Sequence, residues 1–204
     1  MNMGKKGLIE YLESTQGFRS MQLRRAFDEI DRRDFVRGEY FDDAYGDYPL
    51  PIGFGQTISQ PATVLFMVSL LDPRPGEKIL DIGSGSGWTT ALLATAIGDT
   101  GQVFGIEIVP DLVEFGRSNL AKYHLPQAKI LPAGETIGFP QKAPFDKILV
   151  SASAHELPEG LLAQLKLGGR LVLPIENSVW KIDKVSETKI NREEFPGFAF
   201  VPLR

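Results

Sequence analysis

Residues 78–88, KILDIGSGSGW, decide the fold that the rest of the chain must satisfy. KILDI is a short apolar run that indicates a buried strand, and WTTALLATAIG, from Trp88 onward, indicates a helix. Gly83, Gly85 and Gly87 fill the turn between them. Because glycine has no Cβ, backbone amides in such a turn can approach a ligand closely, and a helix N-terminus favours negative charge. The stretch predicts either a binding loop for a small molecule or a purely structural turn.

Strand-like and helix-like segments alternate after this turn. The predicted strands are 102–108, 128–131, 145–153 and 170–175, and the predicted helices are 110–123 and 157–165. Such an alternation predicts an α/β fold with a doubly wound, mainly parallel sheet. Residues 178–187 and 197–203 have the pattern of two more strands, which we expect at an antiparallel edge.

The first sixty residues have a different character. Residues 7–14 and 21–35 carry apolar positions at helical spacing, whereas residues 38–60 are aromatic, acidic and rich in glycine and proline. We interpret them as an N-terminal helical cap followed by an ordered irregular loop. A chain of 204 residues supports one sizeable core. We therefore expect a single domain, 1–204, in which 1–60 form the cap and substrate loop and 61–204 form the α/β core.

The bulk composition argues against several classes of protein. A formal net charge of −4 is not the basic footprint of a nucleic-acid-binding protein. Cysteine is absent, so neither a disulfide framework nor a thiolate metal site is expected. The longest apolar run, from Val64 to Leu71, is too short to cross a bilayer, and the first residues lack the apolar centre of a signal peptide. We expect a cytoplasmic monomer that holds no metal and binds neither nucleic acid nor membranes.

Two carboxylates indicate which small molecule the glycine turn binds. Trp88 stands where a dinucleotide fingerprint requires a third glycine, so that fingerprint is not met. Glu107 ends the next predicted strand, 20 residues beyond Gly87, where a carboxylate can accept the hydroxyls of a ribose. Asp81 at the mouth of the turn would repel a pyrophosphate and suits a ligand with an ammonium and a sulfonium, which is S-adenosylmethionine. Asp81 could instead only orient backbone amides, and Glu107 could be a solvated strand end.

A second motif, FGQTISQP at 54–61, places polar side chains directly before the apolar segment ATVLFMVSLL. One interpretation is that Ser59 or Gln60 caps a helix that starts at Pro61 and runs to Leu71. The other is that the hydroxyls form an uncharged pocket for a substrate. A side chain that caps the helix can hardly contact a substrate as well.

The two motifs together resemble a known family. DIGSGSGW followed by IEI resembles the cofactor core of class I methyltransferases, and GFGQTISQP resembles the hallmark of the protein-L-isoaspartate O-methyltransferases. The likeness runs from RRDFV to the final FVPL, which is nearly the whole chain. It implies a Rossmann-like class I methyltransferase fold with N-terminal helices over the active site. It also implies S-adenosylmethionine as the cofactor and the free carboxylate of isoaspartyl residues in damaged peptides and proteins as the methyl acceptor.

The resemblance also assigns site residues. It gives the active-site role to the hydroxyl of Ser59, and we expect the substrate to contact Gln56, Thr57, Ser59 and His155. The residues expected to bind the cofactor are Thr57, Ile58, Asp81, Gly83, Ser84, Gly85, Gly87, Glu107, Ile108 and Glu135. A carboxylate with a reference pKa of about 4 is already a nucleophile at neutral pH, so the reaction requires no general base. Alignment and removal of water are the main tasks left to the protein.

The chain departs from the family pattern in two places. In PAGETIGFP, Gly134 falls where the family has an adenine-side aspartate, and Glu135 lies one position further along. In SASAHELP, His155 stands where the family commonly has small residues and proline. These departures leave two alternatives to isoaspartyl repair: the same methylation on a dedicated aspartate, or a module that binds S-adenosylmethionine without turnover. Methylation of a nucleic-acid amine and nicotinamide-dependent hydride transfer fit the residues less well.

Overall fold

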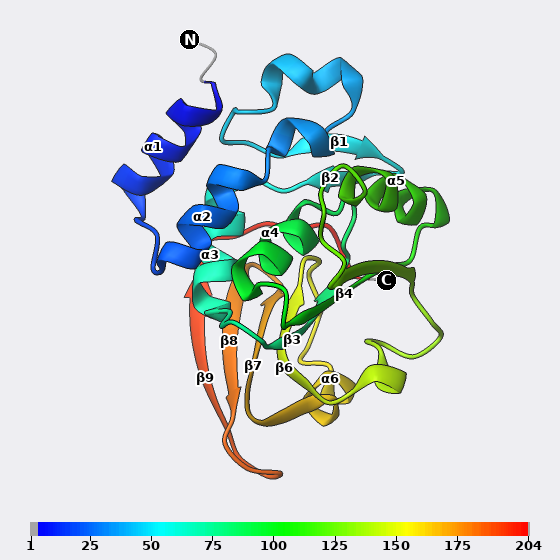
Figure 1. Ribbon diagram of the computed structural model, residues 1–204. Helices are drawn as coiled ribbons and strands as arrows, with labels where there is room; N and C mark the ends of the chain where they lie inside the picture. Colours follow the sequence, from blue (N-terminus) through cyan, green and yellow to red (C-terminus); the bar gives the residue numbers. More distant parts are fainter. Residues whose placement is uncertain (1–3, 204) are drawn as a thin grey trace.

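The computed structural model describes residues 4–203 and is built around a seven-stranded sheet (Figure 1). Its strands lie in the order β5-β4-β3-β6-β7-β8-β9; the first five are parallel, and β8 and β9 are antiparallel to their neighbours. The strands are β3 (Lys78–Ile82), β4 (Gln102–Glu107), β5 (Ala128–Pro132), β6 (Phe145–Val150), β7 (Leu165–Ile175), β8 (Ser178–Lys184) and β9 (Ile190–Pro196). The predicted α/β class and the antiparallel edge are confirmed.

Each face of the sheet has its own layer of helices and its own apolar cluster. The helices α3 (Pro61–Leu71), α4 (Trp88–Ile97) and α5 (Pro110–Leu120) pack with Ile79 on one face. On the other face, Leu80 and Ile82 cluster with Leu161 of the short helix α6 (Glu159–Ala163). Neighbouring residues of a strand point to opposite faces, so the continuous apolar run of β3 is explained by burial on both sides.

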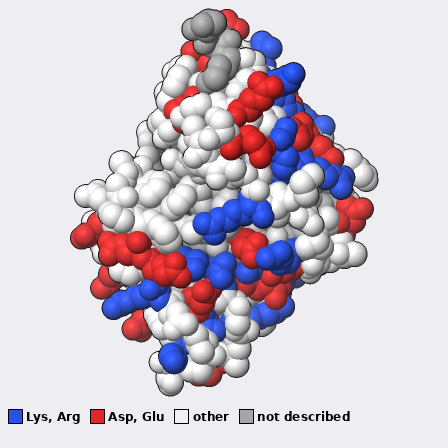
Figure 2. All heavy atoms as spheres, turned by 90° about the vertical axis from the view of Figure 1, so that its left-hand side faces the viewer, with Lys and Arg blue, Asp and Glu red and all other residues white. Residues whose placement is uncertain are grey.

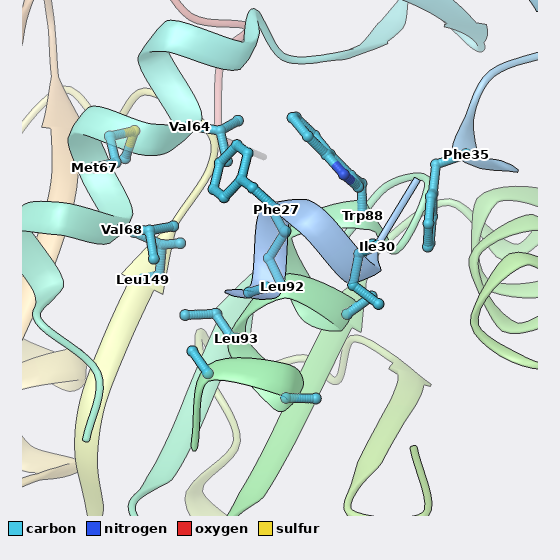
Figure 3. Close-up of a cluster of buried hydrophobic side chains, with 14 of the residues drawn as sticks. Phe27, Ile30, Phe35, Val64, Met67, Val68, Trp88, Leu92, Leu93 and Leu149 are labelled. Carbon is cyan, nitrogen blue, oxygen red and sulfur yellow. The ribbon is translucent and has the colours of Figure 1, made fainter. Parts of the chain in front are cut away.

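The N-terminal segment packs on the helical layer over β3 and β4. It contains α1 (Lys5–Thr15), α2 (Met21–Glu29), the 3₁₀ helices η1 (Arg32–Phe35) and η2 (Gly38–Asp43), and a hairpin of β1 (Leu50–Gly53) and β2 (Gln56–Ile58). Phe27 of α2 points toward Val64 of α3 and Trp88 of α4 (Figure 3), and the ring centroids of Phe27 and Trp88 lie 5.8 Å apart, edge to face. The cap and the α/β part therefore share one hydrophobic core.

Two predictions for the N-terminal segment were wrong. The helix predicted over 21–35 ends at Glu29, because Ile30 and Asp31 are extended, and the chain restarts as η1 with Asp31 as its N-cap. The turn buries Arg32, which is 2% exposed. The segment 38–60 is not irregular throughout, since it contains η2 and the β1–β2 hairpin.

The C-terminal elements also shift against their predicted positions. The helix expected over 157–165 spans only Glu159–Ala163, and Leu165 already belongs to β7. The last strand is β9, and the strand predicted over 197–203 is not formed. A further short helix, η3 (Pro140–Lys142), lies between β5 and β6. The segment after β9 instead runs back across the sheet: the Ser153 amide donates to Val201 O, and the Leu203 amide donates to Ser153 O, each at 2.8 Å.

The surface of the described residues carries charges of both signs. Figure 2 shows acidic and basic side chains interspersed on the face that corresponds to the left side of Figure 1. None of the helices in residues 4–203 combines the length and the hydrophobicity needed to cross a membrane.

Candidate active site

A cavity of about 680 Å³ opens where the parallel strands end, beneath the β1–β2 hairpin. This is the edge at which open α/β sheets bind their ligands, and the volume lies within the range of small-molecule sites, about 300–1,000 Å³. Its wall comes from five stretches that are distant in sequence: the end of the hairpin, the glycine turn after β3, the end of β4, the segment after β5, and the segment after β6. Val201, Pro202 and Leu203 complete the wall.

Glu107 holds the glycine turn in place. Its carboxylate accepts hydrogen bonds from the Gly85 amide and the Val109 amide, each at 2.9 Å, and its side chain lines the cavity while being 6% exposed. Carboxylate oxygens have further lone pairs, so two backbone donors leave acceptor sites for ligand hydroxyls. The alternative that Glu107 is only a solvated strand end is therefore excluded.

Asp81 has the opposite surroundings. It is fully buried, it is absent from the cavity wall, and its Oδ2 accepts a 2.6 Å hydrogen bond from the Thr90 hydroxyl of α4. Burial raises the pKa of Asp81 to about 7; the Thr90 hydrogen bond opposes this shift and the neighbouring Glu107 adds to it. Because Asp81 lies on the α4 side of β3, this placement does not support direct contact with a cofactor ammonium.

Gly87 also lies behind the cavity and not on its wall. Its φ is +86°, and a Cβ built on it would lie 2.9 Å from Ile130 Cδ1 and 3.0 Å from Gly116 O. Glycine is required here so that α4 and α5 can pack closely. Its predicted contact with the cofactor is therefore not supported either, whereas Gly83 and Gly85 do face the cavity.

Ser59 lies on the cavity wall between the hairpin and α3. The helix does not use Ser59 as its cap: Gln60 occupies the N-cap position without a side-chain cap bond, and the Ala62 amide donates to Asp47 Oδ1 at 2.8 Å. Asp47 Oδ2 also accepts from Gln60 Nε2 at 2.9 Å. The capping task is thus met by Asp47, and the Ser59 hydroxyl stays available to a ligand.

Two residues of this wall contain buried polar atoms without partners. Ser84 Oγ and Trp88 Nε1 are buried and make no hydrogen bond within residues 4–203, although both residues line the cavity. Buried polar groups are normally satisfied, so such atoms are expected where a ligand or water completes the site. Together with the Glu107 carboxylate and the open glycine turn, they fit a ligand with ribose hydroxyls and a polar amino-acid end, such as S-adenosylmethionine.

Comparison with known proteins identifies the family to which this chain belongs. Residues 3–204 match the family described as protein-L-isoaspartate(D-aspartate) O-methyltransferase (PCMT). The chain belongs to this family. It is 42% identical to the protein-L-isoaspartate O-methyltransferase of Methanopyrus kandleri, over 98% of this chain and 90% of that protein. It is 38% identical to the Pyrococcus horikoshii protein of the same name, over 97% and 91% of the two chains.

The PCMT fold extends over the whole described chain. A Plasmodium falciparum beta-aspartate methyltransferase (PCMT) in complex with S-adenosyl-L-homocysteine superposes with a TM-score of 0.86 at 27% identity, covering 99% of each chain. The family predicted from the glycine turn and the QTIS motif is therefore confirmed. So is the predicted PCMT architecture with N-terminal helices, although the β1–β2 hairpin lines the cavity and α1 and α2 do not.

Most of the site residues predicted for this PCMT chain meet at the cavity. The predicted residues on its wall are Gln56, Thr57, Ile58, Ser59, Gly83, Ser84, Gly85, Glu107, Ile108, Glu135 and His155. Glu135 and His155 are both exposed, as is Gly134, at the two sequence departures. Their contacts with cofactor and substrate stay predictions.

Three residues of this PCMT site were missed from sequence. Trp88 packs in the core, where it is 2% exposed, and it also lines the cavity. The roles of Arg32 and Asp47 could not be recognised from sequence, because Arg32 lies in a run of alternating charges and Asp47 in an acidic, aromatic loop. The break at Ile30–Asp31 turns Arg32 inward, and periodicity in the sequence does not report such a break.

Proposed function

We propose that this cavity holds S-adenosylmethionine against Glu107 and the Gly83–Gly85 turn while the Ser59 hydroxyl binds the methyl acceptor. The reaction is methyl esterification of the free carboxylate of L-isoaspartyl residues in damaged proteins. Family membership over nearly the full chain favours this repair reaction over a dedicated aspartate acceptor and over a module without turnover. The observation that carries the proposed geometry is that Ser59 lies on the cavity wall with its hydroxyl not used as the helix cap.

Each part of the cofactor has a fitting partner on the wall. Glu107 can accept the ribose hydroxyls, and the amides of the glycine turn can approach the methionine end. Ile108 and Glu135 line the same cavity, and we propose that they contact the adenine end. Asp81 acts from behind the turn, through Thr90 and the start of α4. When bound, the cofactor supplies an electrophilic methyl group on a sulfonium.

The protein's own contribution is alignment. The isoaspartyl carboxylate is ionised at neutral pH, so no residue has to remove a proton from it. A hydroxyl donor on one carboxylate oxygen leaves the other oxygen free to attack in line, and a walled cavity limits competing water. Gln56 and Thr57 flank this donor on the same wall, and His155 lies at the segment after β6.

Replacement of Ser59 by alanine tests the assignment. A hydrogen bond to a charged group contributes about 1.5–3 kcal/mol, so we expect kcat/KM for an isoaspartyl peptide to fall about 10- to 150-fold in Ser59→Ala. Affinity for S-adenosylhomocysteine, measured by calorimetry, should change less than about threefold. Ser118→Ala, on the exposed side of α5, is the matched control. An unchanged rate in Ser59→Ala would show that the hydroxyl does not bind the acceptor.

We further propose that the protein acts as a cytoplasmic monomer with a single domain, 1–204. The core shared by α2, α3 and α4 supports the single domain. The monomeric state and the compartment stay predictions from composition.

A further inference from the structure

We propose that Arg32 is a positioning residue for Ser59, whose guanidinium fixes the backbone of the active-site loop through carbonyl oxygens. The inference rests on the proposed role of Ser59 in binding the acceptor. It concerns a side chain that does not itself line the cavity.

The hydrogen bonds of Arg32 all go to backbone carbonyls. Nη1 donates to Ala44 O at 2.8 Å and to Gly46 O at 3.2 Å, and Nη2 donates to Tyr48 O at 2.9 Å and to Ser59 O at 3.1 Å. Arg32 makes no ion pair within residues 4–203, whereas Arg24, Arg25 and Arg170 each pair with carboxylates. Burial lowers the pKa of Arg32 to about 10, and Asp47 partly offsets this, so the side chain stays charged at neutral pH.

These acceptors belong to two separate stretches of chain. Three lie in 44–48, between η2 and the hairpin, and the fourth is Ser59 itself, after the hairpin. The guanidinium therefore joins the beginning and the end of the loop that presents Ser59. A planar fork of N–H donors can reach several carbonyls at fixed angles, which a lysine ammonium cannot reproduce.

The backbone of Ser59 is held on both sides as a result. Arg32 binds its carbonyl, while Asp47 binds the Gln60 side chain and the Ala62 amide just beyond it. Asp47 lies between Gly46 and Tyr48, whose carbonyls Arg32 also holds. Loss of the guanidinium would release both restraints on Ser59, since the position of Asp47 depends on the same stretch.

The other side of the guanidinium faces the cofactor helix. Arg32 Cζ lies 5.4 Å from the ring centroid of Trp88, which begins α4 and lines the cavity. A cation over an indole face is attracted to it, more strongly when both are desolvated. Arg32 thus connects the loop that carries Ser59 to the helix that follows the glycine turn.

Two substitutions test the inference. Arg32→Lys retains the charge but loses the fork, and Arg32→Ala leaves a space that free guanidinium ion can fill. We expect kcat on an isoaspartyl peptide to fall about 10- to 100-fold in both, because small misplacements of reacting groups have effects of that size. Affinity for S-adenosylhomocysteine should stay within about threefold, because the cofactor wall is intact. Arg33→Ala is the control, since Arg33 is the exposed neighbour in η1.

Rescue separates positioning from general stability. Guanidinium chloride at a few millimolar should restore part of the kcat of Arg32→Ala, and the same concentrations of sodium chloride or urea should not. Wild-type kcat in Arg32→Lys would overturn the inference. So would a parallel loss of kcat and cofactor affinity in that variant, or a folded Arg32→Ala that guanidinium does not rescue. If Arg32→Ala fails to fold, Arg32→Lys alone decides.

A double substitution distinguishes this inference from the role proposed for Ser59. If Arg32 acts through Ser59, Arg32→Lys should have little further effect in a Ser59→Ala background, since groups that act as a unit are not additive. Fully additive losses would overturn the inference while leaving the Ser59 assignment intact. Full activity of Ser59→Ala alone would instead refute the proposed role of Ser59.

Discussion

Asp81, the last but one residue of β3, and Glu107, the last residue of β4, have opposite tasks. Glu107 receives two backbone amides and faces the cavity, whereas Asp81 receives one hydroxyl and is fully buried. Their positions at strand ends were predictable from the glycine turn and its spacing. Their different surroundings were not, because the face that a side chain takes at the last residues of a strand depends on where the strand ends. Glu107 is the last residue of β4, but Ile82 still follows Asp81 in β3.

Glu107→Gln should weaken cofactor binding. The amide group of glutamine would place an NH₂ against one of the two backbone N–H donors and would remove the charge that strengthens hydrogen bonds to hydroxyls. We expect the affinity for S-adenosylhomocysteine to fall about 10- to 150-fold, measured by calorimetry, from a loss of about 1.5–3 kcal/mol. Glu114→Gln, exposed on α5, is the control, and unchanged affinity in Glu107→Gln would contradict the ribose assignment.

Asp81→Asn should alter the dependence of stability on pH in the cofactor-free protein. The ordinary pKa of 3.8 is raised to about 7 by burial, so between these values the folded chain retains a proton that the unfolded chain has lost. Raising the pH through this window therefore favours unfolding. Asparagine carries no charge and can still accept from Thr90. We expect the Tm of Asp81→Asn relative to wild type to increase from pH 5 to pH 8, while exposed Asp99→Asn shows no such trend.

At the scale of elements, α3 begins with a cap supplied from a distant loop. Asp47 takes the place that a local Ser or Thr commonly fills, so the sequence around Pro61 does not reveal it. The hairpin before it was also missed, because prolines and glycines at 49–55 are typical of irregular loops. Gly53, Phe54 and Gly55 all have positive φ, which closes β1 onto β2 in a tight turn.

Asp47→Ala should destabilise the start of α3. Loss of an N-cap costs about 0.5–2 kcal/mol, and we expect a decrease of this size in the free energy of unfolding measured in urea. Asp42→Ala, an exposed acidic residue of η2, is the comparison. Equal stability of the two variants would mean that α3 does not depend on this cap.

The error at the last strand has a similar explanation. INREEFP in β9 is charged and mostly exposed, so it lacks the alternation that identifies half-buried strands. The apolar GFAFVPL looked more like a strand, but Phe198 stacks on Phe66 of α3, at 5.1 Å between ring centroids, and the chain continues to the cavity. The apolar pattern of GFAFVPL therefore predicts that the segment is buried, but it does not predict strand hydrogen bonds.

At the scale of the whole molecule, one tyrosine connects the cap to the α/β part. Tyr123, just beyond α5, donates to Asp34 Oδ2 at 2.6 Å, accepts from the Asp31 amide at 2.9 Å, and stacks on Phe35. Lys122 donates to the Asp34 carbonyl beside it. These contacts involve Asp31, Asp34 and Phe35, the neighbours of Arg32 in and just before η1, so they help to position the residue that holds the Ser59 loop.

Tyr123→Phe retains the stacked ring and removes both hydrogen bonds. An unsatisfied part-buried group costs about 1–3 kcal/mol, so we expect a lower Tm and faster amide hydrogen exchange in residues 31–48 than in β3 or β4. Tyr11→Phe, on the exposed side of α1, is the control. Uniformly faster exchange over the whole chain would indicate global destabilisation rather than a looser cap.

The order of strands and helices in this fold was predictable because each depends on local periodicity. The residues of the site were predictable where they lie in a local motif or follow the end of a predicted strand, as in residues 56–59, 83–85 and 107–108. Three other residues depend on tertiary packing. Arg32 is turned toward Ser59 by a break between α2 and η1, Asp47 caps α3 from a distant loop, and Val201 lies in a C-terminal segment that runs back to the cavity.

The edge strand β9 affects how this protein interacts with partly unfolded substrates. Arg192, Glu193 and Glu194 are exposed along β9, and charged side chains on an edge strand oppose the addition of another strand. The clients of a repair methyltransferase are aged polypeptides, some of them partly unfolded and ready to join any open β-edge. We therefore expect the charged edge of β9 to disfavour co-aggregation of the enzyme with such substrates.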